Sequence, residues 1–537
     1  MFFIYALVYH VFFWAPSVLS APLNSTAQQV SCTRFANSLN IDNTIVISSE
    51  HVIAGSNITM TGGQTVCQIT QKVDANVCRV ALNVTTSSSS SNLVEVWLPD
   101  NQSWNGRFIS TGNGALKGCI QYDDLSYTTS MGFATTGDNG GHDGGTGEPF
   151  LNNNEVVLDF SWRALHSAVV VGKELTQLYY GTPHKKSYYL GCSTGGRQGL
   201  KSVQMFPSDF DGVSAGAPAA DFNHLTDWSG HFYLLTGANT SDPRFLTYDQ
   251  WTTVHNEVLK QCDKPLDGVA DGIVEDPSIC DFEPETLICT SNSTNSSTCL
   301  TSIQAQTVRN VFAPLYGSNN RFLYPRLTPS AGLPAAASGG ILSGTTDTPA
   351  LGWFRYAVYN DSSFDVTTLD ESDYDYSDSL DELHGNISSW SGDLSSFRDR
   401  GGKLITYHGM SDPTISGENS MRYYNHVSQT MNSSSTSLDS FYRFFRISGM
   451  YHCTGGNGAW AFGQKRIARN ATMNVLKSLV AWVENGTAPD VMVGTKWVDD
   501  DETKGVEIER PHCRYPYRTT YVGGNPNVTA GWTCKLS

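Results

Sequence analysis

Strand-like runs of apolar residues alternate with segments of helical spacing along much of the chain. Leu93–Pro99 alternates between apolar and polar residues like a half-buried strand, and the turn at Asn105-Gly106 predicts a hairpin with the following strand. Asp159–Gly181 carries apolar residues at three-to-four spacing, which predicts a helix. Because strands and helices alternate, we expect an α/β fold with a parallel sheet. Further strands are predicted at 44–48, 78–84, 186–191, 210–218, 403–409 and 441–447, with a final helix over 467–484.

This alternation fades between Ala219 and Arg400. The chain has 537 residues, which is more than one hydrophobic core usually serves. About 180 residues are too many for a simple connection. We therefore predict a lid domain over 219–400, inserted into a catalytic domain formed by 21–218 and 401–537. The aromatic residues of 353–356 and Tyr359 suit either a substrate-facing wall of this lid or its hydrophobic core.

Residues 1–20 have the pattern of a signal peptide. Val18 and Ser20 suit the −3 and −1 positions of a cleavage site, so the mature chain would begin at Ala21. An uncleaved membrane anchor is the alternative, but Pro16 interrupts the apolar run. No later apolar stretch reaches the roughly 20 residues that span a bilayer. We expect a secreted, extracellular protein with no membrane contact after cleavage.

Charge, cysteines and glycosylation sequons agree with secretion. The formal net charge of −17 disfavours nucleic acid and anionic membranes as partners. The 12 cysteines contain no CxxC pair, which indicates disulfides in an oxidising compartment rather than zinc ligation. The density of Asn-x-Ser/Thr sequons indicates a glycoprotein. They lie at Asn24, Asn57, Asn83, Asn101, Asn239, Asn292, Asn295, Asn360, Asn386, Asn432, Asn470, Asn485 and Asn527.

A strand that ends at a glycine-flanked serine predicts a nucleophile elbow. Gly191-Cys192-Ser193-Thr194-Gly195 matches G-x-S-x-G, in which the serine occupies a strained turn between a strand and a helix. The glycine-rich loop Thr111–Ala115 follows an earlier strand and suits an oxyanion hole, although a flexible turn is the alternative. We expect the oxyanion donors to be the N–H of Thr194 and one N–H of Gly112–Gly114, with Gly114 as the candidate.

Asp412 and His452 follow the two strands predicted after the lid. The carboxyl ends of parallel strands meet at one edge of a sheet, so both residues are expected near Ser193. The chain order Ser, Asp, His predicts an α/β-hydrolase core with a large inserted lid domain. His452 would take the Ser193 proton, and Asp412 would fix the imidazole tautomer. His142 lies upstream of the serine and is therefore predicted to be a structural hydrogen-bonding residue.

Both Ser193 and His452 have a cysteine as an immediate neighbour. A Cys192–Cys453 disulfide would hold the two Cα atoms roughly 5.5–6 Å apart and would clamp nucleophile and base together. The alternative is that each cysteine pairs elsewhere. The coincidence of two such neighbours favours the clamp.

The segment 262–273 suits a calcium loop. Its carboxylates alternate with glycines, so carboxylate and backbone carbonyl oxygens could surround a hard cation. Asp-Gly repeats also make ordinary turns, and the segment does not match the EF-hand pattern. Both interpretations remain open from spacing alone.

The Cys192-Ser193, Asp412 and His452-Cys453 arrangement resembles the fungal tannase and feruloyl esterase family, and the resemblance covers the mature chain. It implies a structural Ca²⁺ in the lid, with Asp263, Asp267, Val269, Asp271 and Ile273 as ligands, the two apolar residues through their carbonyls. One departure is that Lys264-Pro265-Leu266 separates the first two aspartates by one residue more than expected. The resemblance also implies the disulfides Cys32–Cys78, Cys67–Cys119, Cys262–Cys280, Cys289–Cys299 and Cys513–Cys534.

The resemblance implies a function as well. We expect a secreted serine carboxylic-ester hydrolase that releases ferulate, caffeate or p-coumarate from plant cell-wall esters through an acyl-enzyme. Its partner would be a phenolic acid ester attached to cell-wall polysaccharide. A tannase that hydrolyses gallate esters is the alternative within the family. An inactive, secreted binding glycoprotein with a hydrolase fold is an alternative of a different class.

Overall fold

The computed structural model describes residues 25–60, 67–290 and 298–536. The predicted signal peptide and the sequons at Asn24, Asn292 and Asn295 lie outside these ranges. Among the described helices, none is long and apolar enough to cross a membrane.

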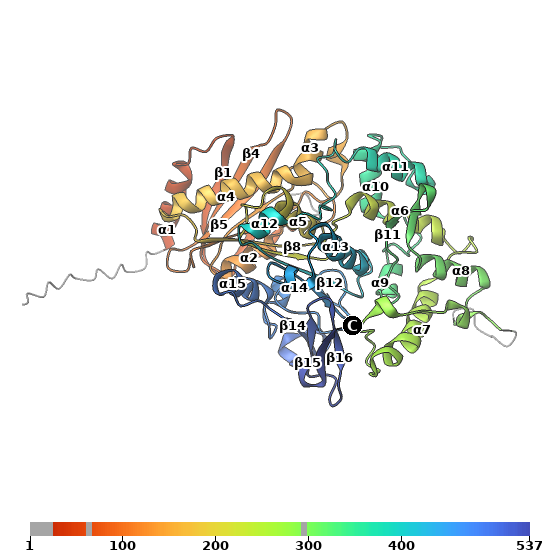
Figure 1. The fold of residues 1–537 in the computed structure, drawn as a ribbon. Helices are drawn as coiled ribbons and strands as arrows, with labels where there is room; N and C mark the ends of the chain where they lie inside the picture. Colours follow the sequence, from red (N-terminus) through yellow and green to blue (C-terminus); the bar gives the residue numbers. More distant parts are fainter. Residues whose placement is uncertain (1–24, 61–66, 291–297, 537) are drawn as a thin grey trace, which may run out of the picture.

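Within the described residues, a nine-stranded mixed sheet forms the centre of the molecule (Figure 1). β1, β4 and β5 run antiparallel along one edge, and the remaining strands are parallel to one another. This sheet, with helices on both faces, confirms the predicted α/β-hydrolase core. In spatial order its strands are β1 (Thr44–Val52), β4 (Val77–Thr85), β5 (Ser91–Pro99), β7 (Ala134–Asp138), β6 (Arg107–Thr111), β8 (Lys186–Cys192), β9 (Gly212–Gly216), β12 (Lys403–Gly409) and β13 (Tyr442–Ile447).

The predicted hairpin between β5 and β6 is wrong. β7 lies between these strands, antiparallel to β5 and parallel to β6. The turn at Asn105-Gly106 leads instead into the pairing of β6 with β8, where Lys185 N–H donates to Gly106 O at 2.8 Å. A local turn signal reports a change of chain direction. It does not report which distant strand takes the neighbouring place in the sheet.

Two hydrophobic clusters cover the opposite faces of the sheet. Successive side chains of a strand point to opposite faces, so Tyr188 belongs to one cluster and Tyr189 to the other. The first cluster includes residues of α2 (Tyr122–Ser130) and α15 (Val475–Asn485). The second includes residues of α4 (Ala164–Tyr180), α5 (Thr194–Met205) and α13 (Gly417–Thr430).

The last helix, α15, begins at Val475 and not at Ile467 as predicted. Asn474 is its N-cap, because the side-chain oxygen accepts a hydrogen bond from Lys477 N–H at 3.0 Å. The preceding Arg466–Ala468 forms only a short 3₁₀ turn. The apolar spacing therefore begins before the first helical residue of the backbone.

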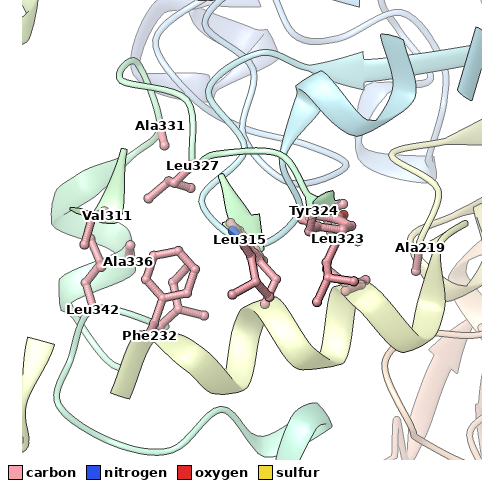
Figure 2. Packing of buried hydrophobic residues seen from close by; sticks show 14 of the residues in the cluster. Ala219, Phe232, Val311, Leu315, Leu323, Tyr324, Leu327, Ala331, Ala336 and Leu342 are labelled. Carbon is pink, nitrogen blue, oxygen red and sulfur yellow. The ribbon is translucent and has the colours of Figure 1, made fainter. Parts of the chain in front are cut away.

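The predicted lid region is largely helical and packs around its own hydrophobic cluster (Figure 2). Trp353 and Phe354 are fully buried in that cluster. Tyr356 and Tyr359 are partly buried and pack against the same cluster, and none of these aromatic residues lines the pocket that contains Ser193. Core packing therefore explains them, and the alternative of a substrate-facing wall is wrong. The cluster also includes Phe150 and Phe160, so the boundaries at 219 and 400 stay a prediction. The region contains α6 (Phe222–Thr236), α7 (Tyr248–Asp267), α8 (Ser302–Val311), β10 (Leu315–Gly317), β11 (Arg321–Tyr324), α9 (Leu333–Ala337), α10 (Thr348–Gly352), α11 (Glu371–Ser379) and α12 (Ser395–Asp399).

The disulfides join the cysteines that the family resemblance implied, and Cys192 pairs with Cys453. Beyond α15, the chain adds two antiparallel ribbons. The remaining elements are α1 (Ser25–Asn37), β2 (Asn57–Thr59), β3 (Thr70–Lys72), α3 (Asn154–Leu158), α14 (Ser435–Leu438), β14 (Val491–Trp497), β15 (Val506–Cys513), β16 (Tyr517–Tyr521) and β17 (Trp532–Leu536).

Candidate active site

Ser193 occupies a strained turn between β8 and α5. Its backbone has φ 66° and ψ −123°, in the left-handed region that non-glycine residues rarely adopt. The turn is held by the Ser193 N–H, which donates to Gly216 O at 3.0 Å. The loop Thr111–Ala115 lies so close to this turn that a Cβ on Gly112 would sit 2.5 Å from the Cα of Gly195. This is the geometry of a nucleophile elbow.

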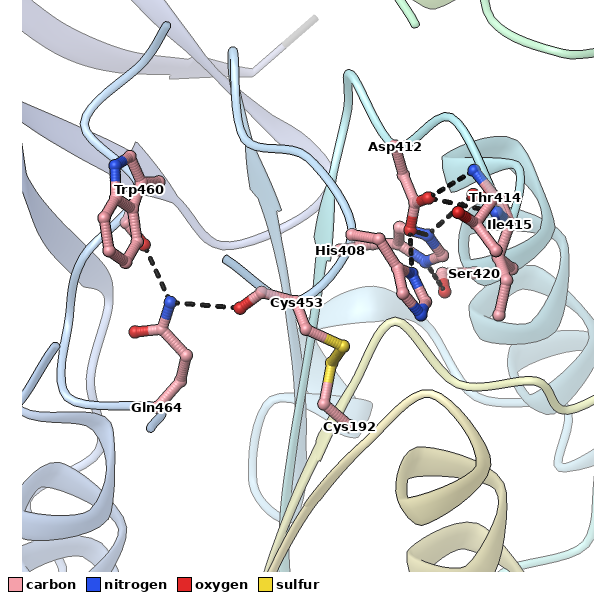
Figure 3. Close-up of a disulfide and its surroundings, with 10 residues drawn as sticks. Cys192, His408, Asp412, Thr414, Ile415, Ser420, Cys453, Trp460 and Gln464 are labelled. Atoms are coloured by element: carbon pink, nitrogen blue, oxygen red, sulfur yellow. Dashed lines mark hydrogen bonds and ion pairs between the residues drawn. A yellow bond between two sulfur atoms is a disulfide. The ribbon is translucent and has the colours of Figure 1, made fainter. Parts of the chain in front are cut away.

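His452 is oriented by a fully buried carboxylate. Its Nδ1 lies 2.6 Å from Asp412 Oδ2. An ionised carboxylate only accepts hydrogen bonds, so Nδ1 carries the hydrogen and Nε2 is left to act as a base. The other oxygen, Asp412 Oδ1, accepts from the N–H groups of Thr414 (2.8 Å) and Ile415 (3.0 Å) (Figure 3).

These partners keep Asp412 ionised. Burial alone would raise the pKa of the Asp412 carboxyl, but the charge of His452 and hydrogen bonds from His408 and His452 outweigh it. The pKa of Asp412 therefore lies well below its usual range. Asp412 is the negative charge needed to stabilise a protonated His452 during a reaction.

Ser193 and His452 line the same pocket, which has a volume of about 410 Å³. Within the described chain, no hydrogen bond joins the Ser193 hydroxyl to the imidazole. Such contacts are often long in the absence of substrate. The pocket is large enough for an aromatic ester and lies where the lid helix α6 faces the sheet edge.

Two backbone N–H groups at the pocket are free to bind an oxyanion. Gly112 N–H donates to Leu190 O (3.2 Å) and Asn113 N–H donates to Gln198 Oε1 (2.9 Å), so both are already occupied. The N–H groups of Gly114 and Thr194 have no partner among the described residues, and both residues line the pocket. Of the candidate segment, Gly114 is thus the residue whose N–H remains available.

The Cys192–Cys453 disulfide ties the elbow to the histidine loop (Figure 3). The two Cα atoms are 6.0 Å apart and the bridge closes a separation of 261 residues. Cys453 is further fixed by Gln464, whose Nε2 donates to its carbonyl at 3.3 Å. The backbone neighbours of Ser193 and His452 are therefore covalently linked across the predicted lid insertion.

A second histidine, His408, contacts Asp412 and was not predicted from the sequence. His408 Nε2 lies 3.2 Å from Asp412 Oδ2 and 3.1 Å from Ile415 O, and Nδ1 lies 2.7 Å from Ser420 Oγ (Figure 3). Both partners of Nε2 are acceptors, so Nε2 carries the hydrogen and donates. The available signal was its position at the end of β12, four residues before Asp412. His142 behaves as predicted, with Nε2 2.9 Å from Leu116 O and no place in the pocket wall.

The predicted calcium ligands present oxygen atoms that suit a cation. Asp263 Oδ1 and Asp267 Oδ2 are buried and have no hydrogen-bond partner in the described ranges of the chain. Helix α7 continues to Asp267, so the two aspartates are four residues apart on one face of the helix. The extra residue between them is part of this helix, and both side chains still lie on the same side. Burial raises the pKa of Asp267 to about 7.

Asp271 is already paired, because its Oδ2 lies 2.6 Å from a nitrogen of Arg510. Among the described residues, no three His, Cys, Asp or Glu side chains converge as a metal site. Backbone carbonyls would therefore supply much of the coordination. The predicted ligand set, including Val269 and Ile273, stays a prediction.

Known proteins resemble this chain closely. A family model described as tannase and feruloyl esterase matches residues 75–534. A protein of Aspergillus oryzae named probable feruloyl esterase B-2 is 48% identical over 94% of this chain and 95% of its own length. The crystal structure of feruloyl esterase B from Aspergillus oryzae has a TM-score of 0.90 at 48% identity, over 94% of this chain and 100% of that chain. The tannin acyl hydrolase from Aspergillus niger shares the fold, with a TM-score of 0.75 at 22% identity over 94% and 95% of the two chains.

Proposed function

Because this chain belongs to the tannase and feruloyl esterase family, and so is an ester hydrolase, we propose that it releases hydroxycinnamic acids from plant cell-wall esters. The acids would be ferulate, caffeate or p-coumarate linked to polysaccharide. The observation that carries the proposal is the Asp412–His452 pair in one pocket with Ser193, in a chain 48% identical to a protein named as a feruloyl esterase. Ser193, Asp412 and His452 are the proposed catalytic residues.

The first half of the reaction forms an acyl-enzyme. Ser193 Oγ attacks the ester carbonyl carbon while His452 Nε2 takes the hydroxyl proton. The carbonyl oxygen becomes an oxyanion, which the N–H groups of Thr194 and Gly114 stabilise. The bond from the carbonyl carbon to the alcohol oxygen then breaks, and His452 gives its proton to that oxygen.

The second half releases the acid. Water replaces the alcohol and attacks the acyl carbon, and His452 takes a proton from it. The second tetrahedral intermediate collapses, Ser193 regains its proton from His452, and the phenolic acid leaves. Asp412 stays ionised throughout and stabilises the imidazolium in both halves.

We also propose that the protein is secreted and that its lid binds Ca²⁺ between the end of α7 and the following loop. Support for secretion comes from the signal-peptide pattern, the disulfides and the sequons. Support for calcium comes from the two unpartnered carboxylate oxygens of Asp263 and Asp267. The ion would cross-link the loop and neutralise the two buried carboxylates, and it takes no part in the chemistry.

A substrate panel tests the proposed function. Purified protein is given methyl ferulate, methyl caffeate, methyl p-coumarate and methyl gallate, with Ser193→Ala as the matched control. We expect kcat/KM to be highest on a hydroxycinnamate and to vanish in the control. Higher turnover of methyl gallate would make the protein a tannase. Failure of a fluorophosphonate to label folded wild-type protein would instead support the inactive binding glycoprotein.

A further inference from the structure

One wall of the reaction pocket contains a buried acid with no partner among the residues that the structure describes. Asp124, in the first turn of α2, lines the pocket and is only 6% exposed. Its Oδ1 is buried without a hydrogen-bond partner, and neither side-chain oxygen is paired within the described chain. Burying an unpaired carboxylate is unfavourable, so a fold does not retain one for stability. A ligand that donates hydrogen bonds would satisfy it.

A second unpaired charge lies on the same wall. The ammonium of Lys465 also lines the pocket, and it makes no hydrogen bond or ion pair in the part of the chain that the structure describes. Burial raises the pKa of Asp124 to about 6, and the nearby positive charge of Lys465 opposes that rise. The two groups are close enough to interact, but not close enough to neutralise each other as an ion pair.

This wall belongs to the histidine side of the pocket. Gln464, the neighbour of Lys465, donates to the carbonyl of Cys453, which directly follows His452. α2 packs on the same segment, because Tyr127 O–H donates to Gly463 O at 2.9 Å. His452 must deliver its proton to the leaving alcohol oxygen, so the alcohol part of an ester lies on the side of the histidine.

The lid side of the pocket contributes several apolar residues. Phe222 and Leu225 of α6, with Pro349 of α10, line the pocket from the lid. These side chains suit the flat, apolar ring of an aromatic acyl group. The lid side of the pocket thus combines these apolar side chains with Thr226, Ser229 and Asp347, and Asp347 is already paired because its Oδ2 accepts hydrogen bonds from Ser229 Oγ and Ala350 N–H. Asp124 and Lys465 lie on the side of His452.

We propose that Asp124 and Lys465 form the subsite for the alcohol part of the ester, which is a sugar whose hydroxyl groups donate to the Asp124 carboxylate. Lys465 donates to a further oxygen of the same sugar. The proposal rests on the proposed esterase function and adds the recognition of the leaving group. A methyl ester makes none of these contacts.

The test compares two esters of one phenolic acid, one with methanol and one with a monosaccharide. The acid is whichever the wild-type enzyme hydrolyses fastest, so the test holds for ferulate or gallate. Asp124→Asn is expected to lower the ratio of kcat/KM for the sugar ester to kcat/KM for the methyl ester by roughly 10- to 100-fold, as for loss of a charged hydrogen bond. Lys465→Gln is expected to lower the ratio by about three- to tenfold.

Asp123→Asn is the matched control, because Asp123 is the exposed neighbour in the same helix turn and does not line the pocket. Its ratio should equal that of the wild type. Stoichiometric labelling of Ser193 by a fluorophosphonate checks that each variant is folded. If Asp124→Asn is not folded, the ratio measured for Lys465→Gln decides the test. An unchanged ratio in folded variants would overturn the proposal. Absence of esterase activity in the wild-type protein would instead overturn the proposed function.

Discussion

Two buried aspartates, one that lines the reaction pocket and one that contacts His452, differ in almost every contact. Asp412, after β12, is fully buried and is held by two imidazoles and two backbone N–H groups. Asp124, on α2, is nearly as buried and has no side-chain partner in the described chain. The pKa of Asp412 is lowered, whereas burial raises that of Asp124 to about 6.

This difference separates two uses of a buried carboxylate. An acid with all its hydrogen bonds made inside the protein is fixed in position and charge, as orienting a catalytic base requires. An acid left without partners destabilises the folded state unless a ligand completes it. We propose that the first belongs to the reaction machinery and the second to recognition of the substrate.

The largest effect is expected when the partnered acid is changed. Asp412→Asn places an amide where His452 needs a carboxylate, so the imidazole adopts the wrong tautomer. We expect kcat to fall by about 10³- to 10⁴-fold, as in triads of this type. Steady-state kinetics on methyl ferulate measure this. A loss of less than tenfold would mean that another residue orients His452.

A smaller effect is expected from opening the clamp. Replacing Cys192 and Cys453 together by serine frees the histidine loop, and a misplacement of about 1 Å costs roughly 10²-fold in kcat. The chain-entropy model gives a stability loss of at most about 5–6 kcal/mol for a loop of this size. The matched control replaces Cys513 and Cys534, which join β15 to β17 and do not line the pocket. Equal kcat losses in the two double variants would exclude a specific role for the clamp.

The second histidine on Asp412 is expected to contribute less again. His408→Phe removes the donor to Asp412 Oδ2 without touching substrate, so kcat should fall by about tenfold while KM is unchanged. His408→Gln keeps a donor and should recover part of the loss. A change confined to KM, or no recovery with Gln, would contradict a positioning role.

The smallest effects concern stability, and the two aspartates should differ in sign. Asp412 has a lowered pKa, so its contribution to stability is present above pH 4 and is lost as the pH falls. Asp124 has a raised pKa, so its folded form loses up to about 3 kcal/mol as the pH rises from 3.8 to about 6. At pH 7, Asp124→Asn should raise Tm and Asp412→Asn should lower it. Calorimetry at pH 4 and pH 7 measures both, and a lowered Tm for Asp124→Asn at pH 7 would contradict the comparison.

The positions of Ser193, Asp412 and His452 could be predicted from sequence because these residues follow local patterns. Ser193 lies in a glycine-flanked turn, and Asp412 and His452 each follow a strand that the apolar pattern marks. Adjacent cysteines supplied the clamp. The sheet itself was predicted by the alternation of elements, although the place of β7 between β5 and β6 was not, because it depends on pairing between distant segments.

The roles proposed for Asp124, Lys465 and His408 could not be predicted in the same way. Asp124 is one of two consecutive aspartates, and only the folded chain distinguishes the buried one from its exposed neighbour Asp123. Lys465 lies in an irregular segment, just before the start of the predicted final helix. His408 lies near the end of a predicted strand, and the strand pattern does not distinguish a histidine that contacts Asp412 from one that only packs in the sheet.

The most direct test of the account measures Asp124→Asn and Asp412→Asn on the same two esters, methyl and monosaccharide, of one phenolic acid. We expect Asp412→Asn to lower kcat/KM for both esters by one common factor. We expect Asp124→Asn to lower kcat/KM for the sugar ester much more than for the methyl ester. If both variants reduce the two esters by the same factor, the two aspartates do not divide catalysis and recognition, and the account is contradicted.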